Sequence, residues 1–118
     1  MKFAALYAML VGLSLLWYWG FVAIRREIPE LDTEPFRILF HIIAELMTAV
    51  ALLAGAVGLL TNSSWGLKVH LLAMGMLLYT LVASPGYFVQ RREWPMVGVF
   101  AVVFLLTLGS LVLVLPAA

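Results

Sequence analysis

A histidine and a glutamate lie four residues apart in the long apolar run 36–60, FRILFHIIAELMTAVALLAGAVGLL, and Glu45 is the only acidic residue of that run. Side chains four apart share one face of a helix, so the imidazole of His41 and the carboxyl group of Glu45 are expected to be neighbours. A carboxyl group in apolar surroundings can carry a proton for a function, or it can be a buried tether between helices. The residues leave both roles open.

The overall composition places these two residues in a membrane protein. The chain has 118 residues, of which 65% are hydrophobic and 11% charged, and its mean hydropathy is +1.12. Soluble domains contain about 45–50% apolar and about 25% charged residues. The net charge of +1 gives no indication of a nucleic-acid partner, and the absence of cysteine excludes disulfides and thiolate sites. We interpret the apolar N-terminus as a retained transmembrane helix, because it is longer than the apolar core of a signal peptide.

The apolar runs predict an all-α fold, an integral membrane bundle of antiparallel transmembrane helices in a single domain, 1–118. Each run is long enough to cross a bilayer at about 1.5 Å per residue. The predicted transmembrane helices are near 3–24, 36–60, 65–83 and 95–115. Pro85-Gly86 is expected to break the chain after the third helix.

Small residues are expected to hold these helices together, because lipid gives little hydrophobic drive for helix association. In the first helix they are Ala5, Ala8 and Gly12, and in the fourth we expect a packing face of Gly98, Ala101, Leu105 and Gly109. His70, near the start of the third helix, is interpreted as an interfacial residue on the membrane side opposite His41.

The arginines predict the orientation in the cell membrane. Antiparallel helices put both termini on one side and five arginines on the other, namely Arg25, Arg26, Arg37, Arg91 and Arg92. Because cytoplasmic loops are enriched in Lys and Arg, we expect a multi-pass protein with these loops in the cytoplasm and both termini outside.

The bundle also predicts one polar pocket, open to the arginine side. Its candidate residues come from the helix ends on that side: His41, Glu45, Tyr79, Tyr87, Gln90 and Arg91. His41 and Glu45 could supply two metal ligands, but a third is not evident, and His41 and His70 lie too far apart to hold a haem together. We therefore predict neither a metal nor a cofactor.

The second helix resembles a known family. The run His41-Ile-Ile-Ala-Glu45, followed by Ala51-Leu-Leu-Ala-Gly55 and Gly58-Leu-Leu-Thr61, is similar to the second helix of the DoxX-like small membrane proteins. Those are four-helix proteins in which a glutamate heads a helix that ends in a Gly-Leu-Leu-Thr-like turn. The family is functionally mixed and includes a subunit associated with quinone reduction, so the resemblance implies a role for Glu45 alone.

Two functional hypotheses follow from these observations. The first is an accessory or binding protein in the lipid bilayer, whose partner is a lipid or quinone-like ligand or another subunit of a membrane complex. The alternative is a proton-coupled transporter of small hydrophobic solutes that acts as a homo-oligomer, because a bundle of this size encloses little volume. An enzyme that acts on a lipid is a third hypothesis, although the sequence shows no recognisable catalytic set.

Overall fold

The computed structural model describes residues 2–25 and 33–117, with the side chains of Tyr87 and Ala117 excepted. Within these residues the fold is entirely helical, as predicted. The elements are α1 (Lys2–Ile24), α3 (Pro35–Leu60), α4 (Gly66–Ala83), α5 (Pro85–Gln90), α6 (Trp94–Val114) and the 3-10 turn η1 (Leu115–Ala117). Four stretches are long and apolar enough to cross a membrane: α1, α3, the stretch Gly66–Gln90 that contains α4 and α5, and α6. This is compatible with a multi-pass membrane protein.

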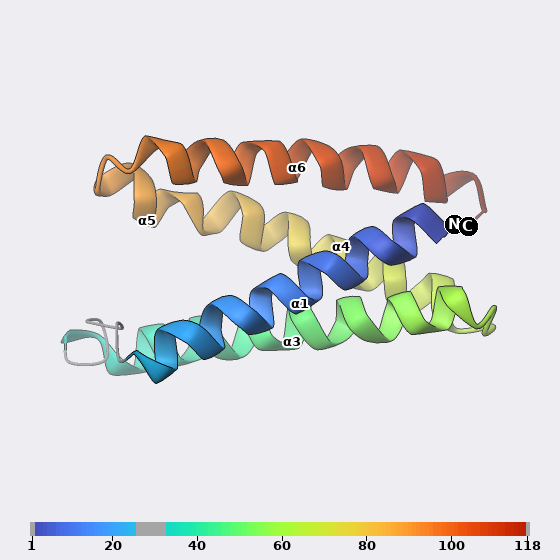
Figure 1. Ribbon diagram of the computed structural model, residues 1–118, viewed down its shortest axis with the longest axis horizontal. Coiled ribbons are helices and arrows are strands. Elements are labelled where there is room, and N and C mark those ends of the chain that lie inside the picture. Colours follow the sequence, from blue (N-terminus) through green and yellow to red (C-terminus); the bar gives the residue numbers. More distant parts are fainter. Residues whose placement is uncertain (1, 26–32, 118) are drawn as a thin grey trace.

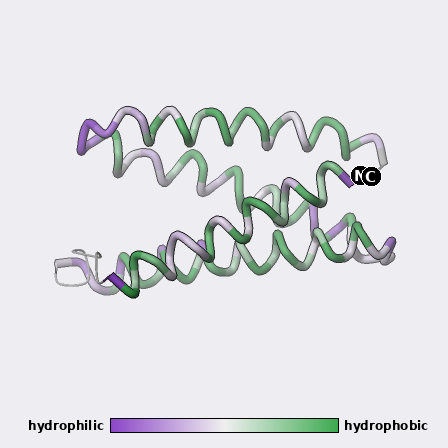
Figure 2. Tube along the Cα trace, viewed as in Figure 1, coloured by the Kyte–Doolittle hydropathy of each residue, from purple (hydrophilic) through white to green (hydrophobic). Residues whose placement is uncertain are grey.

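The long helices alternate in direction, and both termini lie at one end of the molecule (Figure 1). α1 packs on α3, α3 packs on α4, and α6 lies along α4 and α5. The molecule is 44 Å in its longest dimension, which matches the roughly 40–45 Å of a bilayer with its headgroups. Hydrophilic residues gather at its ends and apolar residues fill the length between them (Figure 2).

The α1–α3 and α3–α4 contacts are close because glycines occupy the crossing points. A Cβ atom on Gly12 of α1 would lie 3.2 Å from the carbonyl oxygen of Ala49 in α3. A Cβ on Gly55 of α3 would lie 2.7 Å from the Cα of His70 in α4. Real Cβ contacts of that length do not occur, so Gly55 is needed for α3 and α4 to approach backbone to backbone. The prediction that Ala5, Ala8 and Gly12 pack against another helix is confirmed, because these residues are buried.

The predicted packing face of the fourth helix is wrong within this chain. Gly98, Ala101, Leu105 and Gly109 of α6 are all exposed. The buried residues of α6 are instead Thr107, Ser110 and Val114. One contact of this face is a polar one with α1: the Tyr7 hydroxyl donates to the carbonyl oxygen of Val103 at 3.0 Å and lies 2.7 Å from the hydroxyl of Thr107. The face of α6 that carries Thr107 is therefore the one joined to α1.

The predicted break at Pro85-Gly86 is a junction between helices without an intervening loop. The backbone N–H of Ser84 still donates to the carbonyl oxygen of Thr80 at 2.8 Å, and Pro85 is the first residue of α5. Proline suits this position because it has no N–H to satisfy in the first turn of a helix. The backbone at Ser84 therefore continues the helical geometry of α4.

Candidate functional site

Glu45 lies inside the bundle, with 6% of its surface exposed. It belongs to the face of α3 that also carries Thr48 and Leu52, and both of these residues are buried. Glu45 therefore faces the interior of the bundle. The hydroxyl of Thr48 does not bond to Glu45, because it donates to the carbonyl oxygen of Ala44 in its own helix at 2.8 Å.

The carboxyl group of Glu45 accepts hydrogen bonds from two other helical segments. Its Oε1 atom accepts one from the hydroxyl of Thr80 and one, of 3.0 Å, from the hydroxyl of Ser84 at the end of α4. Its Oε2 atom accepts the indole N–H of Trp19 in α1 at 3.0 Å. The hydroxyl oxygens of Thr80 and Ser84 are themselves 3.0 Å apart. A single carboxyl group thus joins α1, α3 and α4 at one depth.

His41 lies beside this group but is held less tightly. Its Nε2 atom is 3.5 Å from Oε1 of Glu45, and its side chain is 40% exposed. The imidazole also contacts the indole ring of Trp19 edge to face, with ring centroids 5.9 Å apart and an interplanar angle of 72°. His41 therefore forms the boundary between the buried carboxyl group and the outside of the bundle.

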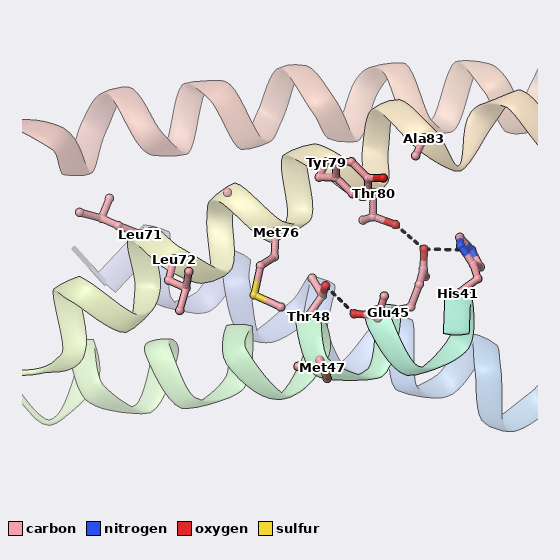
Figure 3. A pocket seen from close by; sticks show the side chains of 12 residues that line it. His41, Glu45, Met47, Thr48, Leu71, Leu72, Met76, Tyr79, Thr80 and Ala83 are labelled. Atoms are coloured by element: carbon pink, nitrogen blue, oxygen red, sulfur yellow. Dashed lines mark hydrogen bonds and ion pairs between the residues drawn. The ribbon is translucent and has the colours of Figure 1, made fainter. Parts of the chain in front are cut away.

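A groove of about 680 Å³ runs between α3 and α4 from this polar group (Figure 3). Its volume falls within the roughly 300–1,000 Å³ of small-molecule sites. Most of its walls are apolar, and His41, Glu45 and Thr80 lie together in the view. The lining residues are His41, Ala44, Glu45, Met47, Thr48, Leu71, Leu72, Gly75, Met76, Tyr79, Thr80 and Ala83.

Three of the predicted site residues lie together in this groove: His41, Glu45 and Tyr79. Tyr79 lines the wall with 77% of its surface exposed, and its hydroxyl is not among the donors to Glu45. Gln90 and Arg91 are exposed at the end of α5 and do not line the groove. The side chain of Tyr87 lies outside the described part of the chain.

Three hydrogen-bond partners of Glu45 were missed by sequence reasoning, namely Trp19, Thr80 and Ser84. Trp19 belongs to an aromatic cluster that is typical of the membrane interface. That cluster gives no indication that the indole N–H of Trp19 donates to a side chain inside the bundle. Thr80 and Ser84 are four residues apart, the spacing that puts two hydroxyls on one helix face. That pair in an apolar helix is the signal that could have indicated a polar partner on a neighbouring helix.

The second histidine is buried between helices. His70 lies near the start of α4 and is fully buried, and within the described residues neither of its ring nitrogens has a hydrogen-bond partner. It is buried because the Gly55 backbone of α3 packs directly on the His70 backbone. No group of three or more His, Asp or Glu side chains that could hold a metal ion is found among the residues described.

The chain belongs to the family described as "Domain of unknown function (DUF8058)", whose model matches residues 1–118. No curated protein matches the chain, and no solved structure matches it.

Proposed function

We propose that this DUF8058 protein is a membrane binding protein whose ligand is an apolar molecule dissolved in the bilayer, of the lipid or quinone-like class. The observation that carries the proposal is the α3–α4 groove, which has long apolar walls and a polar group concentrated around His41 and Glu45. Such a groove suits a molecule with a hydrocarbon body and a single polar end.

Access to the groove supports a ligand that arrives through the bilayer. Met47, Leu72 and Tyr79 line the groove and are also exposed on the outside of the bundle. In a membrane this outer surface would face lipid, so the ligand can enter sideways without passing through water. A membrane-soluble ligand therefore fits better than a water-soluble one.

The orientation that we propose follows from charge. The site lies nearer to the arginine-bearing end of the bundle than to the termini, because Arg25 follows the end of α1, Arg37 lies at the start of α3 and Arg91 follows the end of α5. With these arginines in the cytoplasm and both termini outside, the polar end of the groove lies towards the cytoplasmic leaflet. The resemblance to DoxX-like proteins stays a prediction that agrees with a quinone-like ligand.

Photo-cross-linking tests the proposal. A phospholipid with a diazirine on one acyl chain is added to the protein in nanodiscs, and the labelled peptides are identified by mass spectrometry. We expect saturable labelling of α3 and α4 at the groove. Gly75→Phe should abolish it, because Gly75 lines the groove and its Cβ position is open.

The matched control is Gly98→Phe, an exposed α6 glycine whose Cβ position is equally open. This variant should leave the saturable labelling unchanged. Uniform, non-saturable labelling of all four long helices would overturn the proposal.

A liposome flux assay tests the transporter hypothesis. If the protein carries out proton-dependent solute transport, and Glu45→Gln abolishes that transport, the function is transport and not binding.

A further inference from the structure

A second groove, of about 470 Å³, lies on the outer face of α1 and shares no lining residue with the groove between α3 and α4. Its lining residues are Leu16, Trp17, Gly20, Phe21, Ile24 and Arg25. They recur at steps of four residues, so they form two neighbouring rows along one side of a helix. Trp19, which bonds to Glu45, lies on the other side of α1, because two residues turn a helix by about 200°. In a membrane this α1 groove would face lipid.

One wall of the α1 groove is a stack of flat groups. The rings of Trp17 and Phe21 are stacked, with centroids 6.1 Å apart and an interplanar angle of 25°. Arg25 directly follows the last residue of α1, and its backbone N–H still donates to the carbonyl oxygen of Phe21 at 3.0 Å. Its guanidinium carbon lies 5.1 Å from the centroid of the Phe21 ring. Because an aromatic face attracts a cation, this contact keeps the guanidinium at the end of the groove.

The other wall has a gap at Gly20, between the side chains of Leu16 and Ile24. A Cβ atom on Gly20 would have no atom within 4 Å, so a ligand can approach the helix backbone there. Residues 16 to 25 extend about 13 Å along the helix axis at about 1.5 Å per residue. This length is close to the roughly 15 Å of hydrocarbon in one leaflet of a bilayer. The α1 groove therefore has room for most of one acyl chain.

Arg25 gives this groove a positive charge at one end. The ion pairs among the described residues are Arg37–Glu34 and His41–Glu45, and neither includes Arg25. The guanidinium contact found within these residues is the one with the Phe21 ring, which leaves the N–H donors available. The planar guanidinium can donate two parallel hydrogen bonds to a phosphate group. The charge and the donors at this end therefore fit a phosphate, and the apolar walls fit a hydrocarbon chain.

From this geometry we propose that the α1 groove binds an anionic phospholipid of the surrounding leaflet. The lipid phosphate accepts hydrogen bonds from the guanidinium of Arg25, and one acyl chain lies in the gap at Gly20, beside the rings of Trp17 and Phe21. A zwitterionic phospholipid has the same phosphate but also an ammonium group, which offsets the negative charge that the guanidinium attracts. One arginine near the membrane surface gives an expected preference of about fivefold for the anionic lipid.

Two photoactivatable lipids test the inference: phosphatidylglycerol and phosphatidylcholine, each with the same diazirine-bearing acyl chain. Each probe is added at the same low mole fraction to the protein in nanodiscs of unlabelled phosphatidylcholine. The labelled peptides are identified by mass spectrometry, and the labelling of α1 is normalised to that of α6 by the same probe. We expect the normalised labelling of residues 16–25 to be about fivefold higher with phosphatidylglycerol. Equal labelling by the two probes would overturn the inference.

Arg25→Gln tests the phosphate contact and should bring the ratio between the two probes close to one. Arg92→Gln is the matched control. Arg92 is an exposed arginine that follows α5 and does not line the α1 groove, so its replacement removes the same charge and should leave the ratio unchanged. An equal fall in both variants would show a general effect of surface charge and would overturn the site.

Gly20→Phe tests the gap and should lower the labelling of α1 by phosphatidylglycerol, because the new side chain occupies the position of the acyl chain. Gly75→Phe is its control. It introduces the same side chain in the groove between α3 and α4 and should leave the labelling of α1 unchanged, so the two sites are tested independently. Labelling of α1 that Gly20→Phe does not lower, or that both variants lower equally, would overturn the α1 groove as the binding site.

Discussion

The indole N–H of Trp19 donates a 3.0 Å hydrogen bond to Oε2 of Glu45, and this bond joins α1 to α3 across the interior of the bundle. Replacing Trp19 with Phe removes the donor and keeps an aromatic ring near His41. Leaving a buried acceptor without its donor costs about 1–3 kcal/mol. We expect Trp19→Phe to lower the free energy of unfolding by an amount in this range, measured by denaturation in mixed micelles.

Trp17→Phe is the matched control for that measurement. Trp17 is two residues away on the same helix and is 74% exposed, so its replacement should change stability by less than about 0.5 kcal/mol. Equal losses for the two variants would contradict a special role for the Trp19 bond.

Thr80→Val tests the hydroxyl that α4 donates to Glu45. Valine has nearly the same shape as threonine, so the substitution deletes a donor to a buried carboxyl group at little cost in packing. We expect a loss of about 1–3 kcal/mol in unfolding free energy. Thr48→Val is the control, because that hydroxyl is also buried but bonds only to the backbone of its own helix. The prediction fails if Thr48→Val is as damaging as Thr80→Val.

Gly55→Ala tests the close approach of α3 and α4. The added Cβ would lie 2.7 Å from the Cα and 2.9 Å from the backbone nitrogen of His70, and backbone atoms cannot move aside as a side chain can. Overpacking of this kind costs about 1–3 kcal/mol. Thermal unfolding should therefore occur at a lower temperature than in the parent protein. Gly75→Ala adds the same methyl group where no atom lies within 4 Å, and unfolding temperatures that fall equally in both variants would contradict the prediction.

His70→Leu tests the buried histidine that has no hydrogen-bond partner among the described residues. A buried polar group that is left unsatisfied costs about 1–3 kcal/mol, and an apolar side chain of similar size avoids that cost. We expect the variant to be at least as stable as the parent protein in a detergent thermal-shift assay. A strong loss of stability would show that His70 has a polar partner, such as internal water.

The architecture could be predicted because its determinants are local in the sequence. The apolar runs show their length directly in the sequence. The helical period then shows which glycines and alanines of the first two long helices share a face. The α6 face could not be predicted in this way. Gly98, Ala101 and Gly109 recur as regularly as the small residues of α1, but Tyr7 of another helix bonds to a different face of α6, at Val103 and Thr107.

The candidate site was predicted in part for a similar reason. His41 and Glu45 belong to one helix, so their spacing alone predicts that they are neighbours. The groups that bond to Glu45 come from 26, 35 and 39 residues away along the chain, and their pairing depends on how far each helix slides past the next. Tyr79 and Thr80 are adjacent in the sequence, yet the twist of α4 directs Thr80 to the carboxyl group and leaves Tyr79 exposed.

The three oxygen atoms of Glu45 Oε1, Thr80 and Ser84 form a triangle whose sides are all hydrogen-bond contacts. This triangle connects Glu45 of α3 to the last turn of α4, because Ser84 is the residue before the proline that begins α5. A displacement of α3 at Glu45 would therefore be passed on to the junction between α4 and α5.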